Sequence, residues 1–400
     1  HQADPDRSLE DYAEELKGLL NHAAGTHLDT DVPVGLFLSG GWDSSLVSLY
    51  AGRHSSKPLN SYSLVFPGAP ASDESVFAAQ VAQQIGAQSH EIEVRAPDVL
   101  AVLEKTSNAL EEPVVTAPTA LEYLLAQAAG ADLKVALGGE GSDEIFAGYS
   151  RFEHSPLHRL RAAVPHQLFP RSLPLALSPR WSRALKFMAA TDDERAHLEL
   201  NSFLVPEQTA SLLDRDIPFV PRPGPEAIGI SAATRASFRD RLDLQLTVEF
   251  TSRLADGILF AVDKTSMAHS LEVRMPFLDL DVVEFAHRLP SRFKVQGKQM
   301  KRVLAPLARE LPADVARRRK QGLHVPAGIF SASTIRNFYA ETILETSLAS
   351  GIFDHPRLEA WVRKRVAATN AHTSQLWPLC HFCLWWNNFI DGSSEQNSVP

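Results

Sequence analysis

The first 150 residues of the chain alternate between two patterns of hydrophobic and polar positions. In several segments apolar side chains recur every three to four residues, which predicts amphipathic helices. Short runs of consecutive apolar residues lie between those segments and predict strands that are buried on both faces. In chain order, the expected helices cover residues 8–25, 43–51, 73–86, 97–110 and 118–130, and the expected strands cover residues 32–39, 61–66, 90–94 and 133–139.

Strands that alternate with helices predict an α/β fold, in which a parallel sheet carries helices on both faces. Beyond about residue 150 the alternation stops, and the remaining segments have mainly helical periodicity. We therefore expect three parts: an N-terminal helix and linker at residues 1–32, an α/β core at residues 33–150, and a mostly helical region at residues 151–400.

The composition is that of an ordinary globular protein, with 44% hydrophobic and 22% charged residues. No apolar run approaches the roughly 20 residues of a membrane-spanning helix, and the first residues lack the apolar stretch of a secretory signal. We therefore expect a cytoplasmic protein without a membrane partner. The formal net charge of −9 argues against nucleic acid as a partner, because a phosphate backbone binds basic surfaces.

The chain has two cysteines, Cys380 and Cys383, which excludes a disulfide framework. Their spacing is also compatible with a redox or metal site. Both lie in an aromatic-rich segment near the C-terminus, where small thiols pack well, so we expect them inside a helical core.

A glycine turn, "SGGWDSS" at residues 39–45, follows the first expected strand and precedes a helix. Backbone N–H groups converge at such a turn and the helix dipole favours an anion, so the turn suits a phosphate. Glycines let the backbone approach the anion closely, and serines add hydroxyl donors. Asp43 would repel a phosphate unless a cation lay between them, which makes it a candidate magnesium ligand. The alternative is that Asp43 and the serines only cap the helix.

The turn lacks both the GxxxxGK[ST] pattern of P-loops and the GxGxxG pattern of dinucleotide-binding folds. Its SGGxDS pattern after an apolar strand resembles the PP-loop of the ATP pyrophosphatases, which cleave ATP to AMP. The resemblance implies ATP as the nucleotide. It places the pyrophosphate against Ser39, Gly40, Gly41, Asp43, Ser44 and Ser45, and the adenosine beside Leu38 and Leu64.

A second loop, "LGGEGSDEIFAGYSRF" at residues 137–152, follows the strand expected at 133–139, at the edge where open parallel sheets bind ligands. Glu140, Asp143 and Glu144 repel one another unless a cation or base chemistry uses them, although a capped turn into a helix is the alternative. The loop closely resembles the GEGxDExFxGY signature of the asparagine synthetase family. By that resemblance Asp143 joins Asp43 around magnesium, and Glu140 takes part in proton transfer from the attacking nitrogen.

The resemblance to this family extends along most of the chain, and it adds Gly139 to the ATP-binding residues. "DKTSMAHSLEVRMPFLD" at residues 263–279 is similar to a third block of the family, although it also reads as a helix, a strand and a turn with structural ion pairs. "RRRKQGLHVP" at residues 317–326 matches a K-x-G-x-x-x-P element, in which a lysine neutralises charge in the transition state. Lys320 is that lysine by resemblance, and a solvated basic run is the alternative.

The family resemblance implies an ATP- and Mg²⁺-dependent ligase that forms amides. It would convert a small-molecule or peptide carboxylate into an acyl-adenylate, release pyrophosphate, and transfer the acyl group to ammonia or an amine. Related enzymes that close β-lactams or lasso-peptide rings are the nearest alternative. A PP-loop enzyme that modifies tRNA fits the net charge and the cysteine positions poorly, and a non-catalytic nucleotide-binding subunit has no need to keep Glu140, Asp143 and Lys320 together.

The source of the nitrogen is a separate question. Glutamine-dependent relatives carry an N-terminal glutaminase domain, and the segment "SLEDYAEELKGLLNHA" at residues 8–23 resembles the segment that follows it. We therefore expect the chain to act as the synthetase half, to use free ammonia or an amine, and not to hydrolyse glutamine. A separate glutaminase domain or subunit remains a possible partner.

Overall fold

The computed structural model describes most of the chain: residues 7–67, 69, 73–113, 119–152, 160–161, 163–169, 179–191, 196–197, 206–217, 237–318, 326, 329, 332–367 and 375–391. Within these residues no helix is both long and apolar enough to cross a bilayer. The chain forms two compact units, and each is discontinuous in sequence. The first comprises His1–Arg95, Pro118–Ser155 and Phe238–His324, and the second comprises Ala96–Ala117, Pro156–Ser237 and Val325–Pro400.

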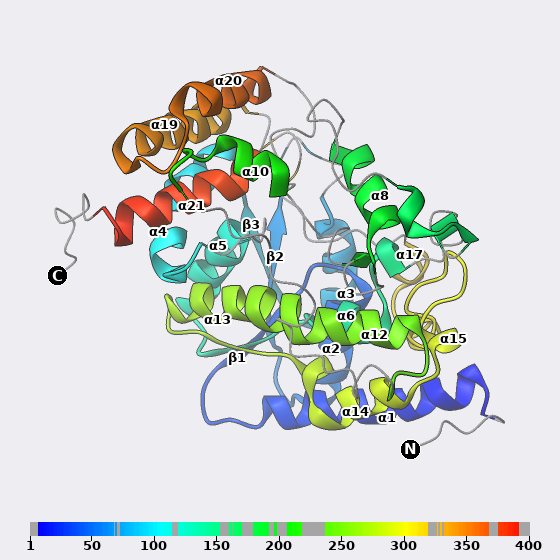
Figure 1. Ribbon diagram of the computed structural model, residues 1–400. Helices are drawn as coiled ribbons and strands as arrows, with labels where there is room; N and C mark the ends of the chain where they lie inside the picture. Colours follow the sequence, from blue (N-terminus) through cyan, green and yellow to red (C-terminus); the bar gives the residue numbers. More distant parts are fainter. Residues whose placement is uncertain are drawn as a thin grey trace. The chain divides into compact units, whose positions relative to one another are not determined.

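The first unit is built on a five-stranded parallel sheet, in the order β3-β2-β1-β4-β5 (Figure 1). The strands are β1 (Val34–Phe37), β2 (Asn60–Val65), β3 (Gln88–Glu93), β4 (Val135–Leu137) and β5 (Glu272–Arg274). The predicted α/β fold is therefore confirmed, and the first four strands lie where the hydrophobic runs predict them. The fifth strand lies inside the 263–279 block and pairs with β4.

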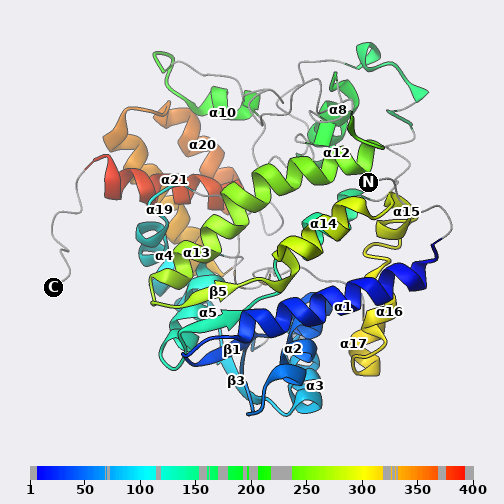
Figure 2. The same ribbon diagram turned by 90° about the horizontal axis from the view of Figure 1, so that it is seen from below.

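Helices cover both faces of this sheet because successive side chains of a strand point to opposite faces. On one face, Leu36 of β1 packs in a core with helices α1 (Leu9–Leu28), α2 (Trp42–His54) and α3 (Ser75–Ile85). On the other, the next residue, Phe37, packs against α5 (Thr119–Gly130) through Ala126 and Ala129. The opening helix α1 is part of the main core: Leu16 and Leu20 are fully buried, and α1 contacts α2 and α14 (Leu280–Arg288) (Figure 2).

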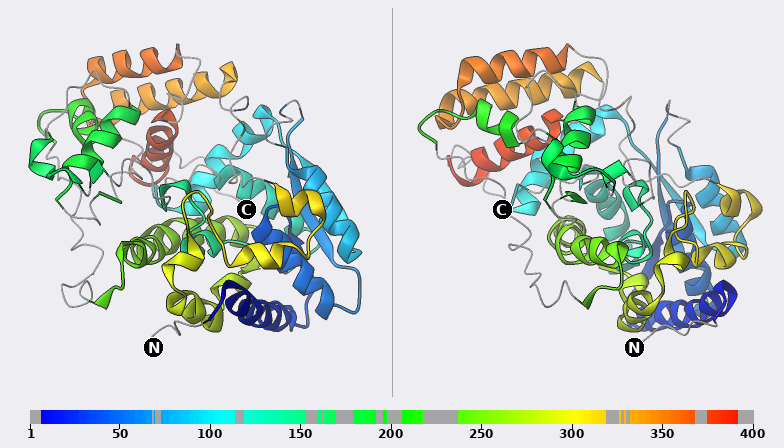
Figure 3. Two further views of the ribbon diagram at one scale, coloured as in Figure 1. Left: turned by 90° about the vertical axis from the view of Figure 1, so that its right-hand side faces the viewer. Right: turned by 45° about the vertical axis from the view of Figure 1, so that its right-hand side comes forward.

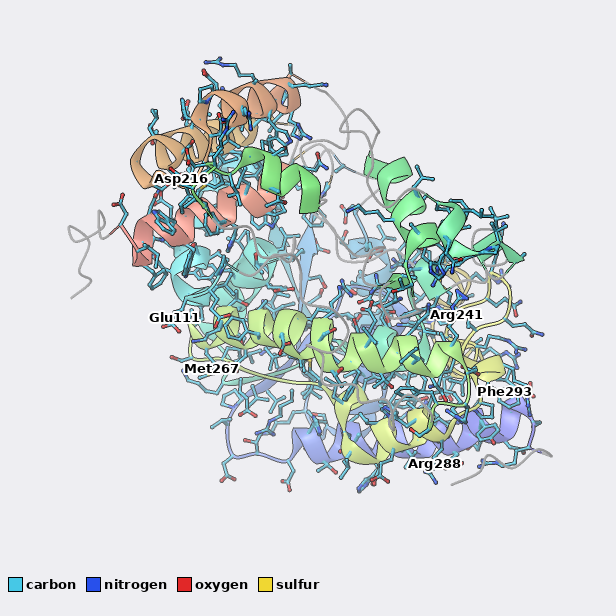
Figure 4. All side chains as sticks on the ribbon, viewed as in Figure 1. Glu111, Asp216, Arg241, Met267, Arg288 and Phe293 are labelled. Atoms are coloured by element: carbon cyan, nitrogen blue, oxygen red, sulfur yellow. The ribbon has the colours of Figure 1, made fainter. Side chains whose placement is uncertain are left out.

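The remaining elements of the first unit are mostly helical. A continuous helical run passes through α12 (Arg241–Val248), a π-helix η4 (Glu249–Leu259) and α13 (Phe260–Met267), and Arg241 and Met267 mark its two ends in Figure 4. Shorter elements complete the unit: α6 (Ser142–Phe146), η1 (Ser150–Phe152), η5 (Pro276–Leu278), α15 (Ser291–Lys294), α16 (Leu304–Ala308) and α17 (Ala313–Arg317).

The described elements of the second unit are helical. They are α4 (Ala96–Leu110), η2 (His166–Leu168), α8 (Pro179–Ala189), α10 (Pro206–Leu212), α19 (Ser333–Ser350), α20 (His355–Val366) and α21 (Leu376–Phe389). Helices α19 and α20 pack side by side (orange in Figure 3), and α19 also packs on α21. Cys380 and Cys383 are both buried free thiols in α21, as predicted, and burial raises the pKa of Cys383 to about 12.

Candidate active site

Two loops meet where β1 and β4 end, and both were singled out from the sequence. β1 is the central strand, with β2 on one side and β4 on the other. From β1 the chain continues to β2, while β4 follows on the opposite side, so this is the switch point at which open α/β sheets bind ligands. A Cβ at Gly139 would lie 2.6 Å from the backbone nitrogen of Ser44. A glycine at position 139 thus allows the loop after β4 to touch the first turn of α2.

The glycine turn after β1 adopts a conformation that only a glycine accepts easily at one position. Gly40 has a φ of +73°, and a Cβ there would lie 2.7 Å from the backbone nitrogen of Ala78. Gly41 is the N-cap of α2, and no side chain caps the helix by a hydrogen bond. Ser39 Oγ accepts a hydrogen bond from Gly41 N at 3.4 Å, and Asp43 lies in the first turn of α2. The positive end of the α2 dipole lies at this turn, where it favours negative charge.

The serines of the turn differ in their hydrogen bonds and burial. Ser39 and Ser44 stabilise the turn, since Ser44 Oγ accepts a hydrogen bond from Ser39 N at 3.2 Å and lies 3.0 Å from Ser39 Oγ. Ser45 is fully buried, and its hydroxyl has no hydrogen-bond partner within the described residues. Leu38, directly after β1, and Leu64 of β2 are both buried, and Leu38 N donates to the Tyr62 carbonyl at 3.0 Å.

Asp43 and Asp143, the two expected magnesium ligands, converge on one cationic group. The ammonium of Lys301 lies 2.6 Å from both carboxylate oxygens of Asp43 and 2.5 Å from Oδ1 of Asp143. Ser142 Oγ also donates to Asp43 at 2.8 Å. Burial lowers the pKa of Lys301 from its usual value, and contact with Asp43 opposes that shift. The structure thus brings together the two acids that the sequence placed in separate motifs.

Glu144, the third acid of the second loop, belongs to a buried ion-pair network. Tyr149 donates a hydrogen bond of 2.5 Å to Glu144, and the guanidinium of Arg253 lies 3.5 Å from the same oxygen. Arg151 pairs with Glu249 at 2.6 Å, and both guanidinium groups lie over the Tyr149 ring. Burial raises the pKa of Glu144, while Tyr149 and Arg253 lower it. The network holds the loop that carries Asp143.

Glu140 lies in the same loop as a buried carboxyl group. Its Oε2 has no hydrogen-bond partner among the described residues and occupies the space that a Cβ at Gly138 would need. Burial raises the pKa of Glu140, and the charge of Asp43 raises it further. Within the described part of the chain, Glu122 of α5 also has a buried Oε2 without a hydrogen-bond partner, and burial together with Glu140 raises its pKa to about 8. Two acids with raised pKa values therefore lie near the ends of β1 and β4.

The segment that precedes Lys320 is attached to the glycine turn. Arg318 donates a hydrogen bond of 2.8 Å to the Gly40 carbonyl and forms an ion pair with Glu74. Trp42 donates from Nε1 to the Val315 carbonyl at 3.1 Å. The Arg318 side chain is only 7% exposed, so this member of the basic run does not lie on a solvated face. Lys320 itself lies outside the described residues.

Comparison with known proteins identifies the family of the chain. The family model described as asparagine synthase matches residues 15–387 of the chain. The chain belongs to the asparagine synthase family. The resemblance read from the motifs is thereby confirmed, and membership supports an ATP-dependent ligase.

Two relatives illustrate the extent of the similarity. A putative asparagine synthetase [glutamine-hydrolyzing] of Mycobacterium bovis is 28% identical over 390 residues, which cover 95% of this chain and 58% of that protein. Asparagine synthetase [glutamine-hydrolyzing] 1 of Bacillus subtilis is 24% identical over 379 residues, which cover 93% of this chain and 58% of that protein. The chain thus spans about 58% of the length of these relatives.

Some residues of this candidate site were not found by sequence reasoning. Lys301 lies in "GKQMKRVL", a stretch without an acid cluster that does not resemble either signature loop, and it is 258 residues from Asp43. Arg253 and Glu249 lie in the π-helix and have no local pattern that links them to Glu144. The only sequence signal for Arg318 was the basic run itself.

Proposed function

We propose that the chain is an ATP-dependent synthetase that activates a carboxylate as an acyl-adenylate and transfers the acyl group to ammonia or an amine. Family membership supports this proposal, and one observation of the structure carries it. The acids of the two signature loops, Asp43 and Asp143, converge within 2.6 Å of a single cationic group at the ends of β1 and β4. Two carboxylates at this position can hold a cation, and a cation here would neutralise the negative charge of a bound polyphosphate.

ATP fits the edge of the sheet at which these loops meet. The turn from Ser39 to Ser45 and the N-terminus of α2 would hold the pyrophosphate through N–H and hydroxyl donors. Gly139 lets the second loop pack against the first turn of α2, because any side chain there would collide with the α2 backbone. Leu38, directly after β1, and Leu64 of β2 would lie beside the adenosine.

Mg²⁺ fits the donor set of the site. Asp43 and Asp143 already share one cation, and Mg²⁺ is usually held by one or two carboxylates with the remaining ligands from phosphate and water. No group of three or more His, Cys, Asp or Glu side chains suitable for a metal occurs in the part of the chain described. Asp43 and Asp143 would hold the ion, which neutralises phosphate charge when bound.

Proton transfer and charge stabilisation are assigned to two further residues. Glu140 has a raised pKa and a buried oxygen without a partner, which suits a base that accepts a proton from the attacking nitrogen. Lys320 would stabilise negative charge as the adenylate forms and breaks. The contact between Arg318 and Gly40 supports this role, since it fixes the chain two residues before Lys320 against the glycine turn.

For the nitrogen donor and the acid, the proposal names a chemical class and no individual compound. The relatives named above carry the words glutamine-hydrolyzing, and this chain corresponds to part of their length. We propose that the chain itself uses ammonia or an amine, that a glutaminase domain or subunit is a possible source of the ammonia, and that it acts in the cytoplasm. The acid is a small-molecule or peptide carboxylate.

Acid-dependent exchange of labelled pyrophosphate into ATP tests the proposal. The purified chain, ATP and Mg²⁺ are incubated with a panel of amino acids, dicarboxylic acids and peptides, and exchange above the acid-free level is expected with at least one. Complete turnover should then give AMP and pyrophosphate. Formation of ADP and phosphate would reject the proposal. So would the absence of exchange with every acid of the panel, if the chain also fails to bind ATP.

A further inference from the structure

The ammonium of Lys301 has the contacts of a bound cation. An ammonium has three N–H donors, and here it has three acceptor groups: the carboxylates of Asp43 and Asp143 at 2.6 and 2.5 Å, and Ser142 Oγ at 3.2 Å. The side chain is only 5% exposed. Its donors are therefore used by Ser142 and by the two acids that the proposed function assigns to magnesium.

The backbone conformation at Lys301 and a glycine at position 148 allow the lysine to contact the two acids. Lys301 has a φ of +49°, in the left-handed region that residues other than glycine rarely adopt. A Cβ at Gly148 would overlap both the Lys301 side chain at Cε and Asp143 Oδ1. Because Gly148 has no side chain, the lysine has room to reach the two acids. A strained residue and a required glycine at the same contact indicate that the pairing is a built feature of the site.

We propose that Lys301 is a tethered cation that competes with the metal ion for Asp43 and Asp143. The inference rests on the metal site of the proposed function. An ammonium and a divalent ion in contact with the same two carboxylates repel each other, so each weakens the binding of the other. In the chain without nucleotide Lys301 holds the site, so the metal has to displace it. The nucleotide phosphates supply the extra ligands that make this displacement favourable.

Binding of Mn²⁺ in the absence of ATP and of any acid tests the competition, with free Mn²⁺ followed by electron paramagnetic resonance. The wild-type chain should bind Mn²⁺ weakly. Lys301→Met removes the charge but keeps an unbranched side chain, and should tighten Mn²⁺ binding at least tenfold, or about 1.4 kcal/mol. Lys298→Met is the matched control: Lys298 is exposed and three positions earlier, so the same loss of charge should change affinity less than twofold. Adding Asp43→Asn to Lys301→Met should abolish the gain.

Thermal unfolding gives a second measurement. Mg²⁺ should raise the melting temperature of Lys301→Met and leave that of the wild type unchanged. If Lys301→Met does not fold, Lys301→Gln, which keeps an N–H donor for the acids without the charge, is measured in the same way. Equal Mn²⁺ affinity of the wild type and the Lys301 variant, or no gain in the variant, overturns the proposal. These titrations contain neither ATP nor acid. A failure of pyrophosphate exchange therefore counts against the proposed function and not against the competition between Lys301 and the metal.

Discussion

Arg318 donates a hydrogen bond of 2.8 Å to the carbonyl oxygen of Gly40, which joins the basic run before Lys320 to the glycine turn after β1. The same guanidinium pairs with Glu74 and lies 4.8 Å from the centroid of the Phe77 ring. Three contacts on one largely buried side chain fix this point of the chain. The segment that leads to the proposed catalytic lysine is therefore positioned before any substrate binds.

Lys320→Ala should reduce turnover by about 10²- to 10³-fold, comparable to the loss of one preorganised donor to developing charge. Affinity for ATP should change much less, because the lysine is proposed to act on the transition state. Steady-state kinetics and ATP titration measure the two effects. Arg317→Ala is the control, since Arg317 belongs to the same run but is exposed. An equal loss in both variants would show that only the charge of the run matters.

Asp43→Asn and Asp143→Asn should each impair adenylation while the protein stays folded. Either substitution leaves Lys301 with one carboxylate partner, so no buried ammonium is stranded. Pyrophosphate exchange as a function of Mg²⁺ concentration, together with circular dichroism, measures activity and folding. Asp31→Asn, at an exposed position, serves as the control. Wild-type exchange rates in both variants would contradict the assignment of the metal ligands.

Glu122→Gln should make the protein less sensitive to alkaline pH. The folded-state pKa of Glu122, about 8, is above its usual value, so the folded state holds a proton that the unfolded chain has lost at neutral pH. The stability that this proton provides is complete below about pH 4.5 and is lost as the pH rises toward 8. Denaturant unfolding at pH 5 and pH 8 should therefore show a smaller decrease in Glu122→Gln than in the wild type. Glu284→Gln, at an exposed site, should reproduce the wild-type decrease.

Gly148→Ala should lower the free energy of unfolding by roughly 1–3 kcal/mol, as expected when a side chain is forced into a packed site. The new Cβ would overlap Asp143 Oδ1 and the Lys301 side chain, and would separate the ion pair. Gly18→Ala in α1 is the matched control, because nothing lies within 4 Å of its added Cβ. In a helix interior that change should stabilise by about 0.5–1 kcal/mol. Equal effects of the two substitutions on chemical denaturation would argue against a packed contact at Gly148.

The sequence by itself determined the local elements of the first 150 residues. Strands β1 to β4 and the helices between them follow from hydrophobic periodicity, which acts within a few residues and does not need the rest of the chain. The two glycine-rich loops could be placed at the ends of β1 and β4 for the same reason. Their acids, Asp43 and Asp143, could be named from the motifs, and the family that the motifs indicated is confirmed.

Only the tertiary structure decided how the acids are used. Asp143 pairs with Lys301, whereas its neighbour Glu144 pairs with Tyr149 and Arg253, although the two acids are adjacent in the sequence. β5 likewise joins the edge of the sheet from a distant segment of the chain. Contacts of this kind depend on which side chains become neighbours when remote segments pack. No periodicity within either segment encodes them, because a local pattern fixes only which face of an element is buried and not which partner covers it.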